Sequence, residues 1–265
     1  MNEYLGVFIL ILSVLFGGGI VVLLEKANKN TVIKLLLSLS GGFLLAISFI
    51  HLIPEIYIHS GETVGYYILL GFLIQLFLEY FSKGIEHGHV HMDAKGGKST
   101  IPWTLFIALS VHSLIEGVPL EAGFHLDALD GHSANEVFSG HVHAHNHVHN
   151  HRGAEGLRGL FLGVVLHKIP VAIALMTLLL SSGFSKLKSW GVLFAFSLMA
   201  PIGILFGHFG AAHFLLDLEV LLAIVVGMFL HISTTIIFES SENHKFNFVK
   251  LISLLIGVVL AIFTI

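Results

Sequence analysis

The chain has 265 residues, of which 55% are hydrophobic and only 11% are charged, and its formal net charge is −4. Soluble globular domains carry about 25% charged residues, so this composition excludes an ordinary water-soluble domain. The absence of cysteine excludes disulfides and thiolate metal sites, and no basic patch indicates nucleic-acid binding, whereas 19 histidines leave imidazole as a plentiful metal ligand.

Eight apolar runs are long enough to cross a bilayer core of roughly 30 Å as helices. They cover residues 4–24, 32–53, 63–82, 103–122, 157–181, 190–209, 219–238 and 249–265. The alternation of apolar and polar residues that is typical of barrel strands is absent. The sequence therefore predicts an all-α membrane protein with eight transmembrane helices, in one domain covering residues 1–265.

Basic residues in the connections orient these runs. Ten of the thirteen lysines and arginines fall in the connections after the first, third, fifth and seventh runs, or in the first residues of the run that follows, and so lie on one face: Lys26, Lys29, Lys34, Lys83, Lys95, Lys98, Lys186, Lys188, Lys245 and Lys250. Positive residues mark the cytoplasmic side of a membrane protein. Both termini are then expected outside, with histidine-rich loops at about 83–101 in the cytoplasm and 123–156 outside.

Ionisable side chains inside apolar runs are the strongest functional signal. His112 and Glu116 lie four residues apart in the fourth run, hence on one helix face, with Ser113 beside them. His167 and Lys168 lie in the fifth run. Such groups are costly in a bilayer and mark ion pathways, although a single histidine can equally be a structural hydrogen-bonding residue.

The three residues His112, Glu116 and His167 would form a His₂Glu ligand set. This set suits Zn²⁺ and leaves a fourth position for water, whereas Mn²⁺ and Fe²⁺ prefer more oxygen ligands. Pro119, Pro170 and Pro201 fall in the fourth, fifth and sixth runs. Since proline has no N–H, each is expected to interrupt its helix near mid-membrane, as in helices that line a polar cavity.

The motifs His112-Ser113-x-x-Glu116-Gly117 and His167-Lys168-x-Pro170 on successive runs resemble those of the ZIP (Zrt-, Irt-like) metal-ion transporters, in the branch with His-Lys-x-Pro in the fifth span. The resemblance implies a 3+2+3 helix bundle. It also implies that spans one, four, five and six carry the metal and move against spans two, three, seven and eight, which gives elevator-like alternating access.

The chain departs from the family pattern at a second metal site. Many members have acidic residues where this sequence has Lys168, Val171 and Ala200. The second site is therefore expected to be absent. One interpretation is that the Lys168 ammonium stands where the second cation would be and balances Glu116; the alternative is a structural ion-pair partner without a role in ion choice.

The remaining histidines form three predicted groups. An outer vestibule would contain His51, Glu55, His208 and His213, although polar residues are also usual at span ends. An inner release group would contain Glu79, His87, His89 and His91. A capture tract between the fourth and fifth spans would contain His141, His143, His145, His147, His149 and His151, the alternative being a polar linker. His231 and Glu239 receive no role.

These features predict a divalent-metal importer, most readily for zinc, which is a transported substrate and not a cofactor. Mn²⁺, Fe²⁺ and Cd²⁺ remain alternative substrates. An intramembrane zinc-dependent hydrolase is the rival function, but no second carboxylate is available as its general base. A third possible function is a metal-regulated receptor that transports no ions. We expect the bilayer and metal ions as partners, with room for a homodimer, and a bacterial cytoplasmic membrane as the location.

Overall fold

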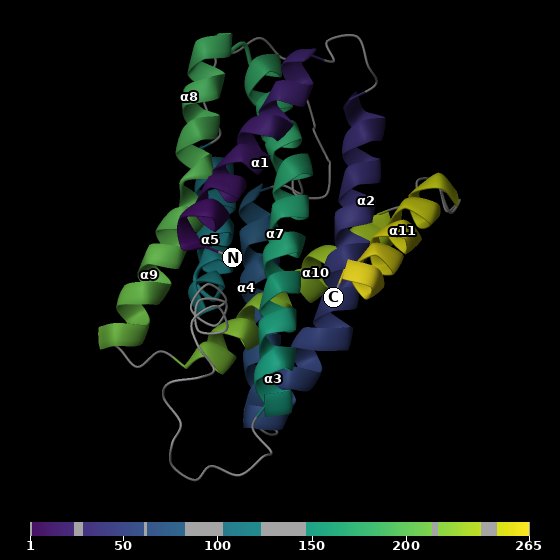
Figure 1. The fold of residues 1–265 in the computed structure, drawn as a ribbon. Helices are drawn as coiled ribbons and strands as arrows, with labels where there is room; N and C mark the ends of the chain where they lie inside the picture. Colours follow the sequence, from purple (N-terminus) through teal and green to yellow (C-terminus); the bar gives the residue numbers. More distant parts are fainter. Residues whose placement is uncertain are drawn as a thin grey trace.

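The computed structural model describes residues 2–23, 29–60, 63–82, 103–122, 147–213, 217–239 and 248–264. The regular elements in these ranges are all helical (Figure 1). They are α1 (Glu3–Leu23), α2 (Lys29–Ile47), the π-helical turn η1 (Ser48–Leu52), α3 (Ile53–Ser60), α4 (Val64–Ser82), α5 (Trp103–Gly117), α7 (His147–Ser181), α8 (Lys186–Ser197), α9 (Met199–His213), α10 (Leu218–Glu239) and α11 (Phe248–Thr264). The predicted all-α fold is confirmed.

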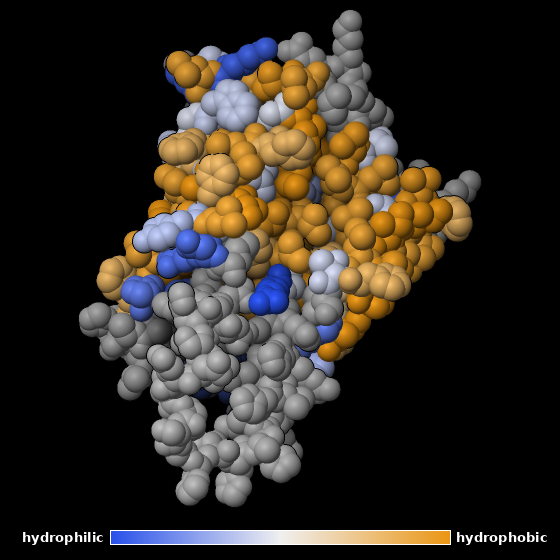
Figure 2. Space-filling model, in the orientation of Figure 1, coloured by the Kyte–Doolittle hydropathy of each residue, from blue (hydrophilic) through white to orange (hydrophobic). Residues whose placement is uncertain are grey.

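Seven helical stretches within the described residues are long and apolar enough to cross a membrane. They are Glu3–Leu23, Thr31–Ile58, Val64–Phe81, Trp103–Ala122, Gly156–Ser181, Lys186–Phe209 and Leu218–Ile237; Phe248–Thr264 is a shorter apolar helix at the eighth predicted position. Apolar side chains cover the middle of the face shown in Figure 2, with hydrophilic residues above and below them. The protein is therefore an integral membrane protein.

The second span extends beyond its predicted end at residue 53 because of the turn η1. Pro54 has no N–H to donate to the carbonyl four residues earlier. The N–H of Ile53 bonds to the carbonyl of Ser48, five residues back, so the chain widens into a π turn just before the proline. The helical path continues into α3, and His51 lies inside the π turn.

The helices pack as two groups. In one group, α2 packs against α11 and α10, and α4 packs against α10. In the other group, α1 packs against α7 and α8, and α5 packs against α9. The groups meet mainly along α2 with α7 and along α4 with α5. We call them the α2/α4 group and the α5/α7 group, a division that follows the two sets of spans implied by the resemblance; the contact of α2 with α7 is as extensive as several contacts within a group.

Glycines bring helices of the same group into backbone contact. A side chain on Gly71 of α4 would collide with the carbonyl of Ile224 in α10, and one on Gly227 of α10 would collide with the carbonyl of Ile68 in α4. Reciprocal contacts of this kind also join α2 to α11, through Gly42 and Gly257, and α5 to α9, through Gly117 and Gly203. Across the boundary, by contrast, Gly163 of α7 meets the side chain of Leu44.

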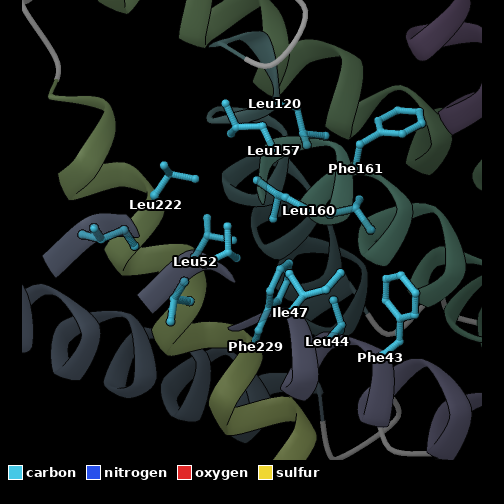
Figure 3. Packing of buried hydrophobic residues seen from close by; sticks show 14 of the residues in the cluster. Phe43, Leu44, Ile47, Leu52, Leu120, Leu157, Leu160, Phe161, Leu222 and Phe229 are labelled. Atoms are coloured by element: carbon cyan, nitrogen blue, oxygen red, sulfur yellow. The ribbon is translucent and has the colours of Figure 1, made fainter. Parts of the chain in front are cut away.

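Two apolar clusters fill the bundle at different heights. The cluster in Figure 3, toward α3, contains Phe43, Leu44, Ile47, Leu52, Leu120, Leu157, Leu160, Phe161, Leu222 and Phe229. The other cluster, toward the α7–α8 connection, contains Leu37, Leu109, Val171, Leu175, Leu179, Leu193 and Phe196. Between them, the stretches from Leu109 to Leu120 and from Val164 to Val171 contain five buried polar or charged residues, His112, Ser113, Glu116, His167 and Lys168.

Candidate metal site in the middle of the bundle

The α5 side of the site ends at a helix break. His112, Ser113 and Glu116 lie in the last part of α5 and are 2%, 1% and 0% exposed. The helix stops at Gly117, and the N–H of Val118 bonds to the carbonyl of Ile115, which Pro119 cannot serve. The interruption predicted at Pro119 is confirmed.

The other two prolines behave differently from each other. The sixth span breaks at Leu198, between α8 and α9, just before Pro201, as predicted. At Pro170, α7 is not divided, because it is a single helix from His147 to Ser181; the kink expected beside His167 stays a prediction. Pro170 removes one backbone hydrogen bond from α7, which packs against α1 and α2. His167 and Lys168 therefore lie on a continuous helix.

The three predicted ligands come together. His112, Glu116 and His167 each offer one ligand atom, and these atoms lie within 4.8 Å of one another. The two imidazole rings are edge to face, with centroids 5.9 Å apart. Among the described residues this is the only such group of three or more histidines and acidic residues. It contains a single carboxylate, so a second carboxylate to serve as a hydrolytic base is lacking there.

Lys168 completes the charge balance of the site. Its ammonium Nζ lies 3.0 Å from Glu116 Oε2 and 2.9 Å from Ser113 Oγ. The ammonium is also 5.9 Å from the ring centroid of Phe196. Glu116 therefore uses one carboxylate oxygen for Lys168, while its other oxygen, Oε1, lies 2.9 Å from His112 Nε2. Both residues predicted to flank the ligands are in contact with the site.

Gln75 is a site residue that sequence reasoning missed. It lies on α4, is 0% exposed, and places its side-chain oxygen 2.8 Å from His112 Nδ1. Gln75 is uncharged and belongs to neither of the two motifs. A lone amide in an otherwise apolar span is itself a signal, because such a group needs a partner inside the bundle.

The predicted outer residues do not form one cluster in the described part of the chain. His208 Nδ1 lies 3.2 Å from Glu121 Oε1, a partner that sequence reasoning missed, and the His208 side chain is 52% exposed. His51 and Glu55 lie on η1 and α3. His213 ends α9, but its side chain is outside the described residues. The vestibule stays a prediction.

One pair of residues lies near the predicted cytoplasmic end. Glu79 Oε2 of α4 lies 3.3 Å from His231 Nε2 of α10, and the His231 ring contacts Phe72 edge to face. The structure thus gives His231, which had no predicted role, a contact with a predicted release residue. His87, His89 and His91 fall outside the described residues, as does the side chain of Glu239.

The histidine tract is divided by the start of α7. His141, His143 and His145 lie outside the described residues, whereas α7 begins at His147 and includes the backbone of His149 and His151. The helix therefore begins before residue 156, the predicted end of the loop, and extends beyond the apolar run by several turns, while the loop itself stays a prediction. Hydropathy marks the membrane span and not the end of the helix.

The second half of the chain carries a family signature. Residues 150–264 match the family model described as ZIP zinc transporter. This part of the chain belongs to the ZIP family. Among curated proteins, none matches the chain significantly.

ZIP proteins are transporters of divalent metal ions and not enzymes, so the chain is a transporter, the metal is its substrate, and the hydrolase alternative is not supported. The matched residues extend from α7 to α11 and include His167 and Lys168. His112, Glu116 and Gln75 precede the match, so the candidate site lies partly within the matched residues and partly before them.

Proposed function

We propose that this ZIP protein moves Zn²⁺ into the cytoplasm through a single-metal site formed by His112, Glu116 and His167, with residues 1–265 acting as one transporter domain. The observation that carries the proposal is the convergence of three buried ligand atoms within 4.8 Å. Two imidazoles and one carboxylate match the ligands that Zn²⁺ prefers, and an incomplete shell allows the ion to leave. Mn²⁺ and Fe²⁺ would find too few oxygens.

The charge of Lys168 and the apolar residues Val171 and Ala200 support the proposal that the site binds a single metal ion. The Lys168 ammonium lies against Glu116 Oε2, so a second divalent cation next to this oxygen would meet a like charge. Val171 and Ala200, where a second site would need acidic residues, are buried and apolar. The ion pair also compensates the Glu116 charge when the site is empty, which matters because an isolated buried carboxylate is costly.

The packing of the two helix groups supports elevator-like alternating access. All three ligands belong to α5 and α7 of the α5/α7 group. Glycine contacts between backbones stiffen pairs within each group, whereas side chains separate the groups at Gly163 and Leu44. Close-packed helix pairs move as units and slide where side chains separate them. A shift of the α5/α7 group would therefore carry the whole site.

The site is closed at both ends in this conformation. Its ligands and Lys168 are 0–3% exposed and lie between the two apolar clusters. Uptake and release then require movement of the α5/α7 group. The basic connections orient the cytoplasmic side. Without an ATP-binding motif in the sequence, a gradient would drive the flux. The outer histidines and the tract would collect the ion.

Zinc uptake by reconstituted protein tests the proposal. The wild type is placed in liposomes containing a fluorescent zinc indicator and compared with His112→Ala and His167→Ala. Ser233→Ala is a matched control, because it removes a buried hydrogen bond to the Gly41 carbonyl between α10 and α2, away from the ligands. We expect saturable uptake that both histidine variants lose and the control keeps. Absence of uptake by a well-folded wild type contradicts the proposal.

The setting of the protein is also proposed. We infer a bacterial cytoplasmic membrane from the compact connections between spans, and the lipid-facing apolar surface leaves room for a homodimer. Cross-linking in native membranes, followed by mass determination, distinguishes a dimer from a monomer.

A further inference from the structure

A hydrogen bond between a side-chain amide and an imidazole crosses the boundary between the two helix groups. Apolar side chains of α4, α5 and α10 meet at this boundary: Leu78, Ala108 and Met228 form a buried cluster, with Ile74, Ile115 and Ile224 packed against it. Within this contact, Gln75 is fully buried and its Oε1 lies 2.8 Å from His112 Nδ1. The bond therefore links the α2/α4 group directly to a proposed metal ligand.

The position of Gln75 is set by its own group. Gly71, one turn earlier on α4, contacts the backbone of Ile224, and Gly227 of α10 contacts the backbone of α4 in return. These contacts fix the height of α4 against α10 because neither helix can slide without a collision between backbones. The Gln75 carbonyl is thus held at a defined place beside α5.

The chemistry of the amide then determines the state of the imidazole. A side-chain carbonyl only accepts hydrogen bonds, so the proton of a neutral His112 ring lies on Nδ1. The lone pair is then on Nε2, which lies 2.9 Å from Glu116 Oε1, another acceptor. A proton or a metal ion on Nε2 would be stabilised by this carboxylate. Nε2 is thus the ring atom that would bind the ion, while Nδ1–H donates to Gln75.

We propose that Gln75 is a positioning residue that holds His112 in the Nδ1–H tautomer and makes zinc affinity depend on the position of the α5/α7 group. A hydrogen-bond acceptor on the second ring nitrogen orients a metal-bound histidine and raises its basicity. Because Gln75 belongs to the other group, movement of α5 breaks the bond. The ion is bound tightly where the bond exists and more weakly where it does not. This inference rests on the proposed zinc transport.

The tautomer is measured first, in the metal-free protein. ¹⁵N-histidine NMR distinguishes Nδ1–H from Nε2–H, and the His112 signal is identified by its loss in His112→Gln. We expect Nδ1–H in the wild type and in Gln75→Glu, whose carboxylate is also an acceptor. We expect Gln75→Leu to lose this tautomer. An Nε2–H tautomer in the wild type, with the proton directed to Glu116, overturns the proposal whether or not the protein transports zinc.

Zinc binding and flux give the second measurement. Loss of the acceptor should weaken zinc binding by about 10- to 100-fold and raise KM, as is usual when the outer partner of a metal-bound histidine is removed. Gln75→Glu should retain most of the affinity, and Ser233→Ala should retain all of it. If Gln75→Leu binds zinc as tightly as Ser233→Ala does, the proposed role is wrong.

The two proposals fail in different ways. A wild-type protein with the Nδ1–H tautomer but no zinc uptake contradicts the proposed transport. Zinc uptake by the wild type with an unchanged KM in Gln75→Leu contradicts only the role of Gln75. If Gln75→Leu does not fold, the wild-type tautomer and the Gln75→Glu affinity still decide the question.

Discussion

Lys168 of α7 and Glu116 of α5 form an ion pair of 3.0 Å at the centre of the bundle, with both side chains almost completely buried. The pair joins the two helices that provide the proposed metal ligands. It also leaves Glu116 with one carboxylate oxygen that faces the histidines. The two oxygens of Glu116 thus have different partners, Lys168 for Oε2 and His112 for Oε1.

Replacing Lys168 with Asp should create a second metal site. The substitution removes the ammonium and adds a carboxylate beside Glu116, which supplies the oxygen ligands that a second divalent cation needs. Metal content of the purified protein should rise from one to two zinc ions per chain. Lys168→Arg is the control and should keep one ion per chain. Unchanged stoichiometry in Lys168→Asp would make Lys168 a structural partner only.

Ser113→Ala should lower the thermal stability of the protein without changing the number of metal ions bound per chain. The hydroxyl accepts a 2.9 Å hydrogen bond from the Lys168 ammonium, and bonds to charged groups contribute about 1.5–3 kcal/mol. Thermal unfolding in detergent should show a lower Tm than the wild type. A Tm equal to that of the wild type would mean that Glu116 alone satisfies the ammonium.

The glycine contacts predict opposite results for two alanine substitutions. Gly71→Ala places a methyl group against the Ile224 carbonyl and should destabilise the protein by about 1–3 kcal/mol. Gly191→Ala on α8, where nothing lies within 4 Å, should be neutral or stabilise the helix by up to about 1 kcal/mol. Unfolding free energies of both variants test this contrast, and equal values would argue against close backbone packing of α4 and α10.

Substitution of the six tract histidines by asparagine should raise KM for zinc uptake and leave the maximal rate unchanged. The tract offers weak, exchangeable sites that raise the local zinc concentration, which matters only when zinc is scarce. Because the length of the chain is unchanged, α7 keeps its start at His147. Identical uptake curves for the wild type and this variant would identify the tract as a polar linker.

Local spacing explains which parts of the site could be predicted. His112 and Glu116 share a helix face however the helices pack, because they are four residues apart. Ionisable side chains are also costly in free energy inside a bilayer, which marks them as functional candidates. The break at Pro119 follows from missing backbone hydrogen bonds in the same way. These features depend on one helix at a time, so the sequence is sufficient for them.

Features that depend on two helices could not be predicted. Gln75 matters only because α4 packs against α5, and Glu121 only because His208 of α9 comes next to it. The packing of α7, which is continuous through Pro170, against α1 and α2 is likewise a relationship between separate helices. The π turn before Pro54 is one of several ways to accommodate a proline, and the sequence does not choose among them.

The apolar clusters on both sides of the proposed site have a consequence for the cell as a whole. If the site opens only by movement of a helix group, a membrane that contains this protein would stay electrically insulated between movements, because the buried clusters of Leu109 and Leu120 lie on the two sides of the proposed site in the conformation described. Each ion would need one excursion of a helix group, and such motions take microseconds to milliseconds. Flux would then saturate at the rate of that motion, however steep the metal gradient becomes.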